Sequence, residues 1–185
     1  MKKTTLKSAK TLAFTALFVA LITVGAYISI PIAPIAFTLQ TLFVLLSGAL
    51  LGGINGMVCV LIYIFMGLIG LPVFTGGGAG FSYVLKPTFG FLIGFVFASL
   101  SVGLIAGKNP KVSTKRLSFA LLFGTLIIYF FGVLYYLIIQ KFYFGNAVDI
   151  KFVLWAFWII FIPSDLLKGV LAFFTAKKVL PVIYK

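Results

Sequence analysis

The chain has 185 residues, of which 63% are hydrophobic and 9% are charged, and its formal net charge is +13. A water-soluble domain of this size cannot bury so much apolar surface in one core, so the composition excludes that class. The positive charges gather at the ends of apolar runs and are not spread over polar surface, which argues against nucleic-acid binding. Composition and charge together indicate an integral membrane protein.

Apolar runs fill nearly the whole chain and predict six transmembrane helices. An α-helix needs ~20 apolar residues to cross ~30 Å of hydrocarbon, and glycine, proline or charged residues separate the runs. We therefore expect an all-α protein with a single transmembrane domain over residues 1–185. The predicted spans are 9–30, 38–52, 55–71, 87–106, 117–140 and 152–177.

The first run begins with a basic head, as a signal peptide does, but it is long enough to span and no A-x-A-like cleavage site closes it. We expect an uncleaved first helix. Small residues recur on one of its faces at i, i+4, i+7 and i+11, so another helix can approach that face closely. Packing inside the bundle is the default explanation, and docking of an external partner is the alternative. This alanine stripe consists of Ala9, Ala13, Ala16 and Ala20.

The second and third spans are separated only by the letters GGIN, which predicts a tight antiparallel helical hairpin. Gln40, flanked by Thr38 and Thr41, places an amide inside the second span. This amide can face a ligand cavity or hydrogen-bond to a neighbouring helix, and both interpretations stay open. Cys59 is the only cysteine, so an internal disulfide is excluded, and we expect it to fill space between helices.

The connection between the third and fourth spans, LPVFTGGGAGFSYVLKP, is long and rich in glycine. Glycines allow the backbone to approach a ligand closely, while Phe74, Phe81 and Tyr83 offer apolar contacts around them. A flexible turn is the simpler interpretation, but a turn seldom carries three aromatic residues. We therefore expect a loop that covers a ligand. It is not a phosphate-binding loop, because GxxxxGK[ST] is absent.

Asp165 and Lys168 lie inside the sixth apolar span, where each ionised group costs ~2.5 to 3.5 kcal/mol on insertion scales. At i and i+3 they share one helix face, and their side chains should project back toward the external side. A self-satisfied salt bridge is one explanation. The favoured explanation is that the pair forms polar anchors for a small solute, with Trp158 in the apolar wall of its site. Pro163 lacks an N–H and can free a carbonyl near residue 159, which would add a polar group beside the pair.

Three tyrosines of the fifth span, Tyr129, Tyr135 and Tyr136, are either interface anchors or cavity walls.

The distribution of basic residues predicts the orientation in the membrane, because cytoplasmic loops carry an excess of lysine and arginine. An N-in, C-in topology leaves only Lys86, Lys141 and Lys151 outside. It places inside Lys2, Lys3, Lys7, Lys10, Lys108, Lys111, Lys115, Arg116, Lys177, Lys178 and Lys185.

The residue types separate three classes of function. An enzyme would need bases, nucleophiles or metal ligands, but the chain has no histidine, one cysteine and two carboxylates. A passive pore would need polar groups at successive depths, whereas they are concentrated at one level. A solute-capturing transporter subunit fits best, and the absence of a Walker motif means that its energy must come from a partner. We expect no catalytic residue, cofactor or metal.

Three stretches resemble the BioY family, the biotin-specific S components of energy-coupling factor (ECF) transporters. They are PIAPIAFTLQTLFVLLSGALLGG, GLPVFTGGGAGFSYVLKPTFGFLIGF and PSDLLKG, in the family's order. The resemblance implies the six-helix S-component fold, in the bacterial plasma membrane, and high-affinity capture of biotin from outside. It also implies assembly with a transmembrane T component and two cytoplasmic ATPases. An S component for another vitamin, and a scaffold with a purely structural ion pair, remain as alternatives.

The resemblance further implies roles for individual residues. Asp165 and Lys168 would bind the biotin head, and the alanine stripe of the first helix would dock on the T component. Lys86 and Phe91 depart from the family pattern, where glycine and tyrosine are usual; Lys86 either reaches the biotin carboxylate or, as we slightly favour, sits in water. Further candidate contacts for biotin are Trp158, Gln40, Phe74, Gly77, Gly78 and Tyr83.

Overall fold

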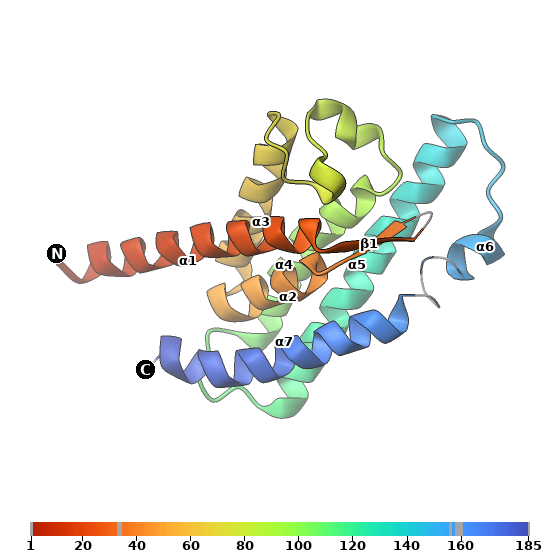
Figure 1. Cartoon of the computed structure of the whole chain (residues 1–185). Helices are drawn as coiled ribbons and strands as arrows, with labels where there is room; N and C mark the ends of the chain where they lie inside the picture. The colour runs from red at the N-terminus through yellow and green to blue at the C-terminus, as the bar shows by residue number, and fades with distance from the viewer. Residues whose placement is uncertain (1, 33–34, 156, 158–160, 185) are drawn as a thin grey trace.

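A computed structural model describes residues 2–32, 35–155, 157 and 161–184. Six long helices and a two-stranded ribbon make up most of this part of the chain (Figure 1). Two short 3-10 turns, Thr75–Gly77 and Phe81–Leu85, lie in the loop after the third helix. The elements are α1 (Lys2–Tyr27), β1 (Ser29–Ile32), β2 (Ile35–Thr38), α2 (Gln40–Leu51), α3 (Gly53–Leu68), α4 (Phe89–Ala106), α5 (Thr114–Phe142), α6 (Ile150–Leu154) and α7 (Ile162–Ile183).

The ribbon between the first two helices was not predicted. The first span was expected to reach residue 30, but α1 ends at Tyr27, and β1 pairs antiparallel with β2 from Ser29 opposite Thr38. Pro31 disfavours a helical conformation for the residue before it, so the chain becomes extended there. The ribbon carries the chain back to the start of α2 and brings Phe37 and Thr38 to the site described below.

The predicted sixth span is not one continuous helix. The structure has α6 and, beginning only at Ile162, α7, which continues to Ile183. Pro163, which was expected to free a carbonyl near residue 159, lies in the first turn of α7, where a helix has no use for its missing N–H. Residue 159 lies outside the described residues. The consequence is that Asp165 occupies the first turn of a helix and not its centre.

Glycines allow the central helices to pack closely. A Cβ on Gly48 of α2 would lie 2.3 Å from the carbonyl oxygen of Ser99 on α4, and one on Gly103 would lie 2.1 Å from the backbone nitrogen of Gly53. Ser47 and Ser99 share a buried hydrogen bond of 2.9 Å at the same crossing. These contacts hold α2, α3 and α4 together as a rigid frame behind the site.

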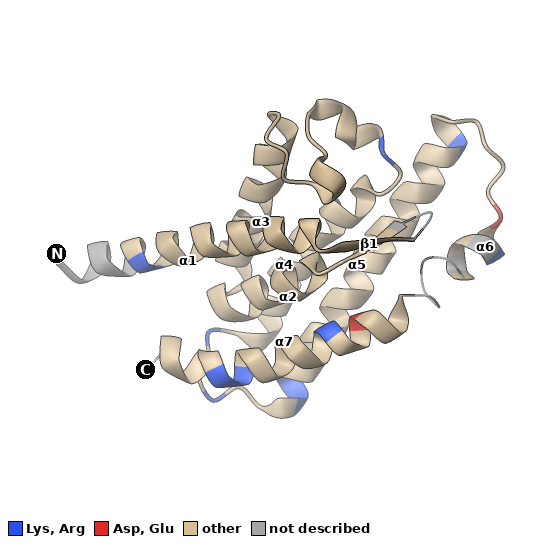
Figure 2. Cartoon of the chain, viewed as in Figure 1, with Lys and Arg blue, Asp and Glu red and all other residues tan. Residues whose placement is uncertain are grey.

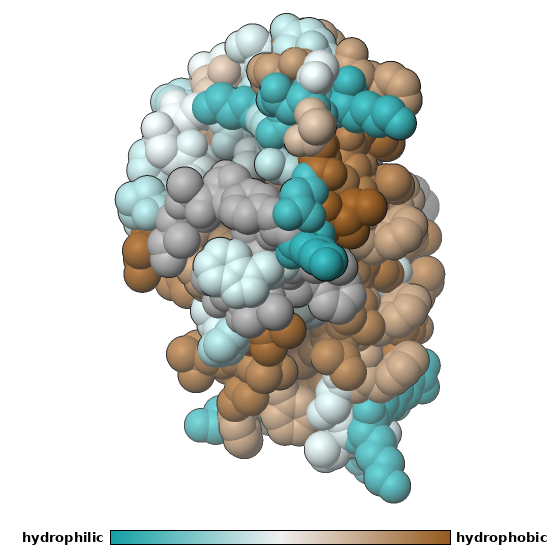
Figure 3. Space-filling view, turned by 90° about the vertical axis from the view of Figure 1, so that its right-hand side faces the viewer, coloured by the Kyte–Doolittle hydropathy of each residue, from teal (hydrophilic) through white to brown (hydrophobic). Residues whose placement is uncertain are grey.

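The surface has the hydrophobicity of a membrane protein. Among the described residues, three helical segments are long and apolar enough to cross a bilayer, namely Ala9–Tyr27, Phe89–Ala106 and Thr114–Phe142, and α2 and α3 are shorter apolar helices. Large apolar side chains such as Phe119 and Phe130 on α5 are exposed. Figure 3 shows a hydrophobic area down one side of the molecule, with hydrophilic groups above and below it.

The charged residues separate toward two ends of the molecule (Figure 2). Lys10, the loop between α4 and α5, and the basic residues late in α7 lie toward one end, where both termini are also drawn. The basic residues in the loop after α3, late in α5 and in α6 lie toward the other end, together with the acidic residue just before α6. This arrangement places the two groups of basic residues on opposite sides of the apolar region, as the predicted topology requires.

The alanine stripe of α1 is exposed. All four residues, Ala9, Ala13, Ala16 and Ala20, present their side chains outward, while Phe18 and Ile22 of the same helix are buried. The default expectation that these alanines pack inside the bundle was therefore wrong. Cys59, by contrast, is fully buried, as expected for a space-filling residue, and its sulfur lies 3.6 Å from the Thr15 carbonyl oxygen.

Candidate functional site

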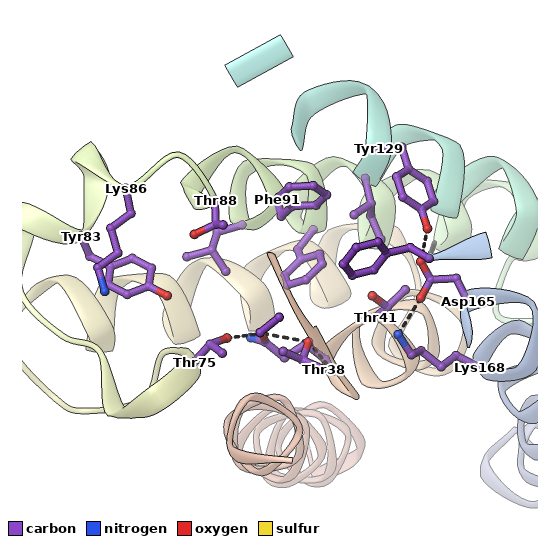
Figure 4. Close-up of a pocket in the computed structure, with 16 residues that line it drawn as sticks. Thr38, Thr41, Thr75, Tyr83, Lys86, Thr88, Phe91, Tyr129, Asp165 and Lys168 are labelled. Carbon is purple, nitrogen blue, oxygen red and sulfur yellow. Dashed lines mark hydrogen bonds and ion pairs between the residues drawn. The ribbon is translucent and has the colours of Figure 1, made fainter. Parts of the chain in front are cut away.

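A pocket of about 230 Å³ lies between β2, the start of α2, the loop after α3, and helices α4, α5 and α7. Its polar wall comes mainly from threonines, and aromatic side chains make most of its apolar wall. Ionisable side chains lie at its two ends (Figure 4). The lining residues are Ala36, Thr38, Gln40, Thr41, Thr75, Tyr83, Lys86, Thr88, Phe91, Leu92, Phe95, Ile128, Tyr129, Phe161, Asp165 and Lys168.

One end of the pocket is formed by an ion pair. The Lys168 ammonium lies 2.6 Å from Asp165 Oδ1, and the two side chains are 8% and 10% exposed. The other carboxylate oxygen accepts a hydrogen bond from the Tyr129 hydroxyl of α5. Because Asp165 lies in the first turn of α7, the positive end of the helix dipole also stabilises its negative charge. The carboxylate is thus held in a fixed orientation toward the pocket.

Lys168 can bind a ligand in addition to Asp165. A lysine ammonium has three N–H donors, and one of them is directed at Asp165. Its nitrogen also lies 5.9 Å from the centre of the Phe37 ring, and Phe37 stacks on Phe161 at 4.1 Å. These two rings form an apolar wall beside the charges. Trp158, predicted for the same wall, lies outside the described residues.

Gln40 connects three parts of the structure. Its amide nitrogen donates to the Tyr63 hydroxyl of α3 at 2.8 Å, and its amide oxygen accepts from Thr38 and Thr75, each at 3.2 Å. The Tyr63 hydroxyl in turn donates to the Val73 carbonyl oxygen at 3.1 Å. Gln40 therefore does both of the things considered for it: it lines the pocket, and it hydrogen-bonds to a neighbouring helix.

The glycine-rich loop is anchored at several points. Phe74 is fully buried, its ring packs against Tyr63 and Tyr83, and a Cβ on Gly67 would lie 2.1 Å from it. The Gly80 amide donates to the Gly67 carbonyl oxygen at 2.7 Å. A loop fastened in this way is not the flexible turn that was the simpler alternative.

Within this loop, the predicted site residues have different positions. Tyr83 lines the pocket, as does Thr75, whereas Phe74, Gly77 and Gly78 lie outside the pocket wall. Gly77 has a φ of 72°, a left-handed conformation that favours glycine, and a Cβ on Gly78 would lie 2.3 Å from the Tyr83 ring. These glycines therefore allow the loop to fold against Tyr83.

The second end of the pocket carries Tyr83 and Lys86 (Figure 4). Lys86 is exposed, and its ammonium lies 4.4 Å from the centre of the Tyr83 ring, so it lines the pocket mouth while remaining in contact with solvent. Burial raises the pKa of the Tyr83 phenol above its ordinary value, so this group is a neutral hydrogen-bonding partner at physiological pH, as an ordinary phenol is. The pocket thus has a buried ion pair at one end and a free positive charge at the other.

Several lining residues were not predicted, or their role was left open. Tyr129, one of three tyrosines in the fifth span, binds Asp165, whereas Tyr135 donates to the Val84 carbonyl oxygen outside the pocket wall. A hydroxyl inside an apolar span was the available signal, but spacing alone does not show which tyrosine faces the acid. Thr88 and Phe95 gave no comparable signal as pocket residues, whereas Phe161 precedes Asp165 by four residues, a helical spacing that predicts a shared face. Phe91, noted only as a departure from the family pattern, also lines the pocket.

Apolar helices arranged around a pocket with charged ends define a membrane protein that binds a small solute. The sequence model of the BioY family matches residues 1–185. The chain belongs to the BioY family. Its helical architecture is that of the crystal structure of the S-component for biotin from an ECF-type ABC transporter. That likeness has a TM-score of 0.78 and 27% identity, and it covers 94% of this chain and 92% of that chain.

Similar sequences come from several organisms. A probable biotin transporter BioY of Lysinibacillus sphaericus is 48% identical over 129 residues, which is 70% of this chain and slightly less than two thirds, 65%, of that protein. A biotin transporter BioY of Thermotoga maritima is 38% identical over 156 residues, which is 84% of this chain and 87% of that protein. These family members are transporters, and the chain is accordingly not classed with enzymes.

The contact between Thr75 and Gln40 predicts a specific effect on the loop. Thr75→Val keeps the side-chain shape but removes the hydroxyl that donates to Gln40, a bond worth ~0.5 to 1.5 kcal/mol, and with it the contact of that hydroxyl with Tyr83. We expect amide hydrogen exchange in residues 74–80 to rise about two- to tenfold. Thr23→Val is the matched control, because the Thr23 hydroxyl bonds only to Val19 within α1. An equal change in both variants would show that the loop does not depend on this contact.

Proposed function

We propose that the chain captures biotin from outside the cell and serves as the substrate-binding subunit of an ECF-type ABC transporter. The observation that carries the proposal is the buried Asp165–Lys168 pair at one end of the pocket in a BioY-family chain. Relatives described as biotin transporters, and the structural likeness to an S-component for biotin, support it.

The chemistry of biotin matches the two ends of the pocket. Its ureido ring has two N–H donors and a carbonyl oxygen, so the Asp165 carboxylate can accept an N–H while the Lys168 ammonium donates to the carbonyl. Tyr129 holds the carboxylate in place. The stacked rings of Phe37 and Phe161 provide an apolar surface for the sulfur-containing ring. Lys86 at the opposite end then pairs with the valerate carboxylate.

The proposed function also assigns the exposed alanine stripe of α1. A smooth, outward-facing row of alanines allows a helix of the transmembrane T component to pack closely against it. Two cytoplasmic ATPases would supply the energy, since the sequence has no Walker motif. The bacterial plasma membrane is the proposed location, with both termini at the cytoplasmic side, where most basic residues gather.

Lys168→Met tests whether the ion pair anchors the ligand. The variant removes a charge-assisted hydrogen bond in a desolvated site, so we expect biotin affinity to fall by about one to two orders of magnitude in a titration of purified protein. Lys177→Met is the control, because Lys177 lies on the same helix but donates to the Val112 carbonyl oxygen away from the pocket.

The double variant Asp165→Asn/Lys168→Met separates ligand binding from structural stabilisation. It leaves no unpaired buried charge, so thermal stability should recover relative to Lys168→Met. Biotin affinity should remain low if the pair binds the ligand. Wild-type affinity in the double variant would instead support the scaffold alternative, in which the pair only fixes helix packing.

Lys86→Gln tests the assignment of the second end of the pocket. Lys86 is exposed, so the expected loss of biotin affinity is modest, about two- to fivefold. Binding of biotin methyl ester, which lacks the negative charge, should be unaffected by the substitution. Lys141→Gln, which removes an outer charge away from the pocket, serves as the control. Equal losses for biotin and its ester would contradict the proposed carboxylate contact.

Ala16→Trp tests the docking role of the alanine stripe. An indole ring on this exposed face should prevent close helix packing, so co-purification with the T component and biotin uptake should both be lost. Biotin binding by the isolated chain should be retained. The control is Leu122→Trp, which places the same ring on an exposed face of α5. Normal complex formation by Ala16→Trp would show that the T component docks on another surface.

A further inference from the structure

A second cavity, of about 610 Å³, lies at the end of the molecule where most basic residues gather. We call it the basic-end cavity. It shares no lining residue with the proposed biotin site. Its wall includes Lys10, Phe14, Leu50, Lys108, Ile183 and Tyr184, which come from the first half of α1, the end of α2, the residues after α4, and the end of α7.

The two lysines of this cavity have no carboxylate partner among the described residues. The chain has two acidic side chains; Asp165 pairs with Lys168, and Asp149 precedes α6 near the opposite end. Lys10 donates one hydrogen bond, to the Ile183 carbonyl oxygen at 3.0 Å, and an ammonium has two further donors. Within residues 2–32, 35–155, 157 and 161–184, the positive charge of this cavity is therefore not neutralised by an acidic side chain.

Lys108 supplies the second positive charge of the cavity. Its side chain lies over Gly52, since a Cβ there would be 2.6 Å from Lys108 Cε. Gly52 joins the end of α2 to the start of α3, so the carbonyl end of one helix and the N–H end of the next meet there, and the net positive charge comes from the lysine. Asn55, from the first turn of α3, also lines the cavity.

Apart from Thr11 and Asn55, the remaining wall is apolar. Phe14 of α1 and Ile183 at the end of α7 contribute hydrocarbon surface, and Leu50 and Leu51 are almost fully buried beneath them. The Tyr184 hydroxyl donates to the Leu50 carbonyl oxygen at 2.6 Å, which leaves the aromatic ring as part of the wall. The cavity thus combines basic groups with an apolar surface at the end of apolar helices, as required by a ligand with an anionic head and a hydrocarbon tail.

From this combination we infer that the basic-end cavity binds an anionic phospholipid of the cytoplasmic leaflet. The lipid phosphate lies between Lys10 and Lys108, near the start of α3, and an acyl chain follows the surface of Phe14 and Ile183. A soluble anion would use the charges but not the apolar wall, which is why we assign the site to a lipid. The site is independent of biotin binding, and its test does not use biotin.

The test compares lipids retained by the full chain. Protein is purified from vesicles of phosphatidylcholine with a minor fraction of phosphatidylglycerol, and the bound lipids are counted by native mass spectrometry. We expect the wild type to retain phosphatidylglycerol in clear preference to phosphatidylcholine. Lys10→Gln/Lys108→Gln should reduce that preference about tenfold, and Lys10→Arg/Lys108→Arg should preserve it.

The control variant, Lys141→Gln/Lys151→Gln, removes the same charge from the opposite end of the molecule and should retain the lipid preference. An unchanged preference in Lys10→Gln/Lys108→Gln would overturn the proposal, as would a wild type without preference. Inorganic phosphate provides a second arm. If it displaces phosphatidylglycerol while phosphatidylcholine is unaffected, the cavity is a site for free anions and the lipid assignment is wrong.

Discussion

The ion pair between Asp165 and Lys168 is the interaction on which the rest of the site depends. Either charge alone would be expensive to keep among apolar helices, and their mutual attraction offsets only part of that cost. The structure adds a helix N-terminus behind the carboxylate and a tyrosine hydroxyl from α5 in front of it. These supports keep the pair oriented at a pocket that a solute can enter.

The ion pair can position a ligand only if the walls of the pocket are also held in place. The frame of α2, α3 and α4 is held by close backbone contacts at glycines, such as Gly48 against Ser99. Gln40 then ties that frame to both the ribbon and the loop through Thr38 and Thr75. Polar groups that are fully paired in this way add rigidity, because breaking any one of them leaves a buried donor or acceptor without a partner. Both ends of the pocket are therefore positioned by one connected framework.

Much of this architecture could be predicted from the sequence. Hydrophobic run lengths predict the helices, and the basic residues predict the two ends, because both features act through local composition. Asp165 and Lys168 stand out because charge is rare in apolar spans. The ribbon at Ser29–Thr38 and the late start of α7 could not be predicted this way, since they depend on how prolines are accommodated by neighbouring elements.

Individual contacts of the site were harder to predict for a different reason. The partner of Asp165, Tyr129, is 36 residues away, and its selection over Tyr135 depends on how α5 rotates against α7. Phe74 was expected near the ligand because it belongs to the loop, but it packs behind the pocket against Tyr63. Such distinctions arise from three-dimensional packing, to which periodicity and composition are insensitive.

The buried ring of Phe74 has a consequence for how long a solute stays bound. If the loop withdraws to release its ligand, this fully buried side chain must leave its place between Tyr63 and Tyr83. Exposing an aromatic ring of this size costs roughly 1.5 to 3 kcal/mol, which corresponds to about a ten- to hundredfold slower opening. A ligand that leaves by this route would thus be released more slowly because of Phe74, a residue outside the pocket wall.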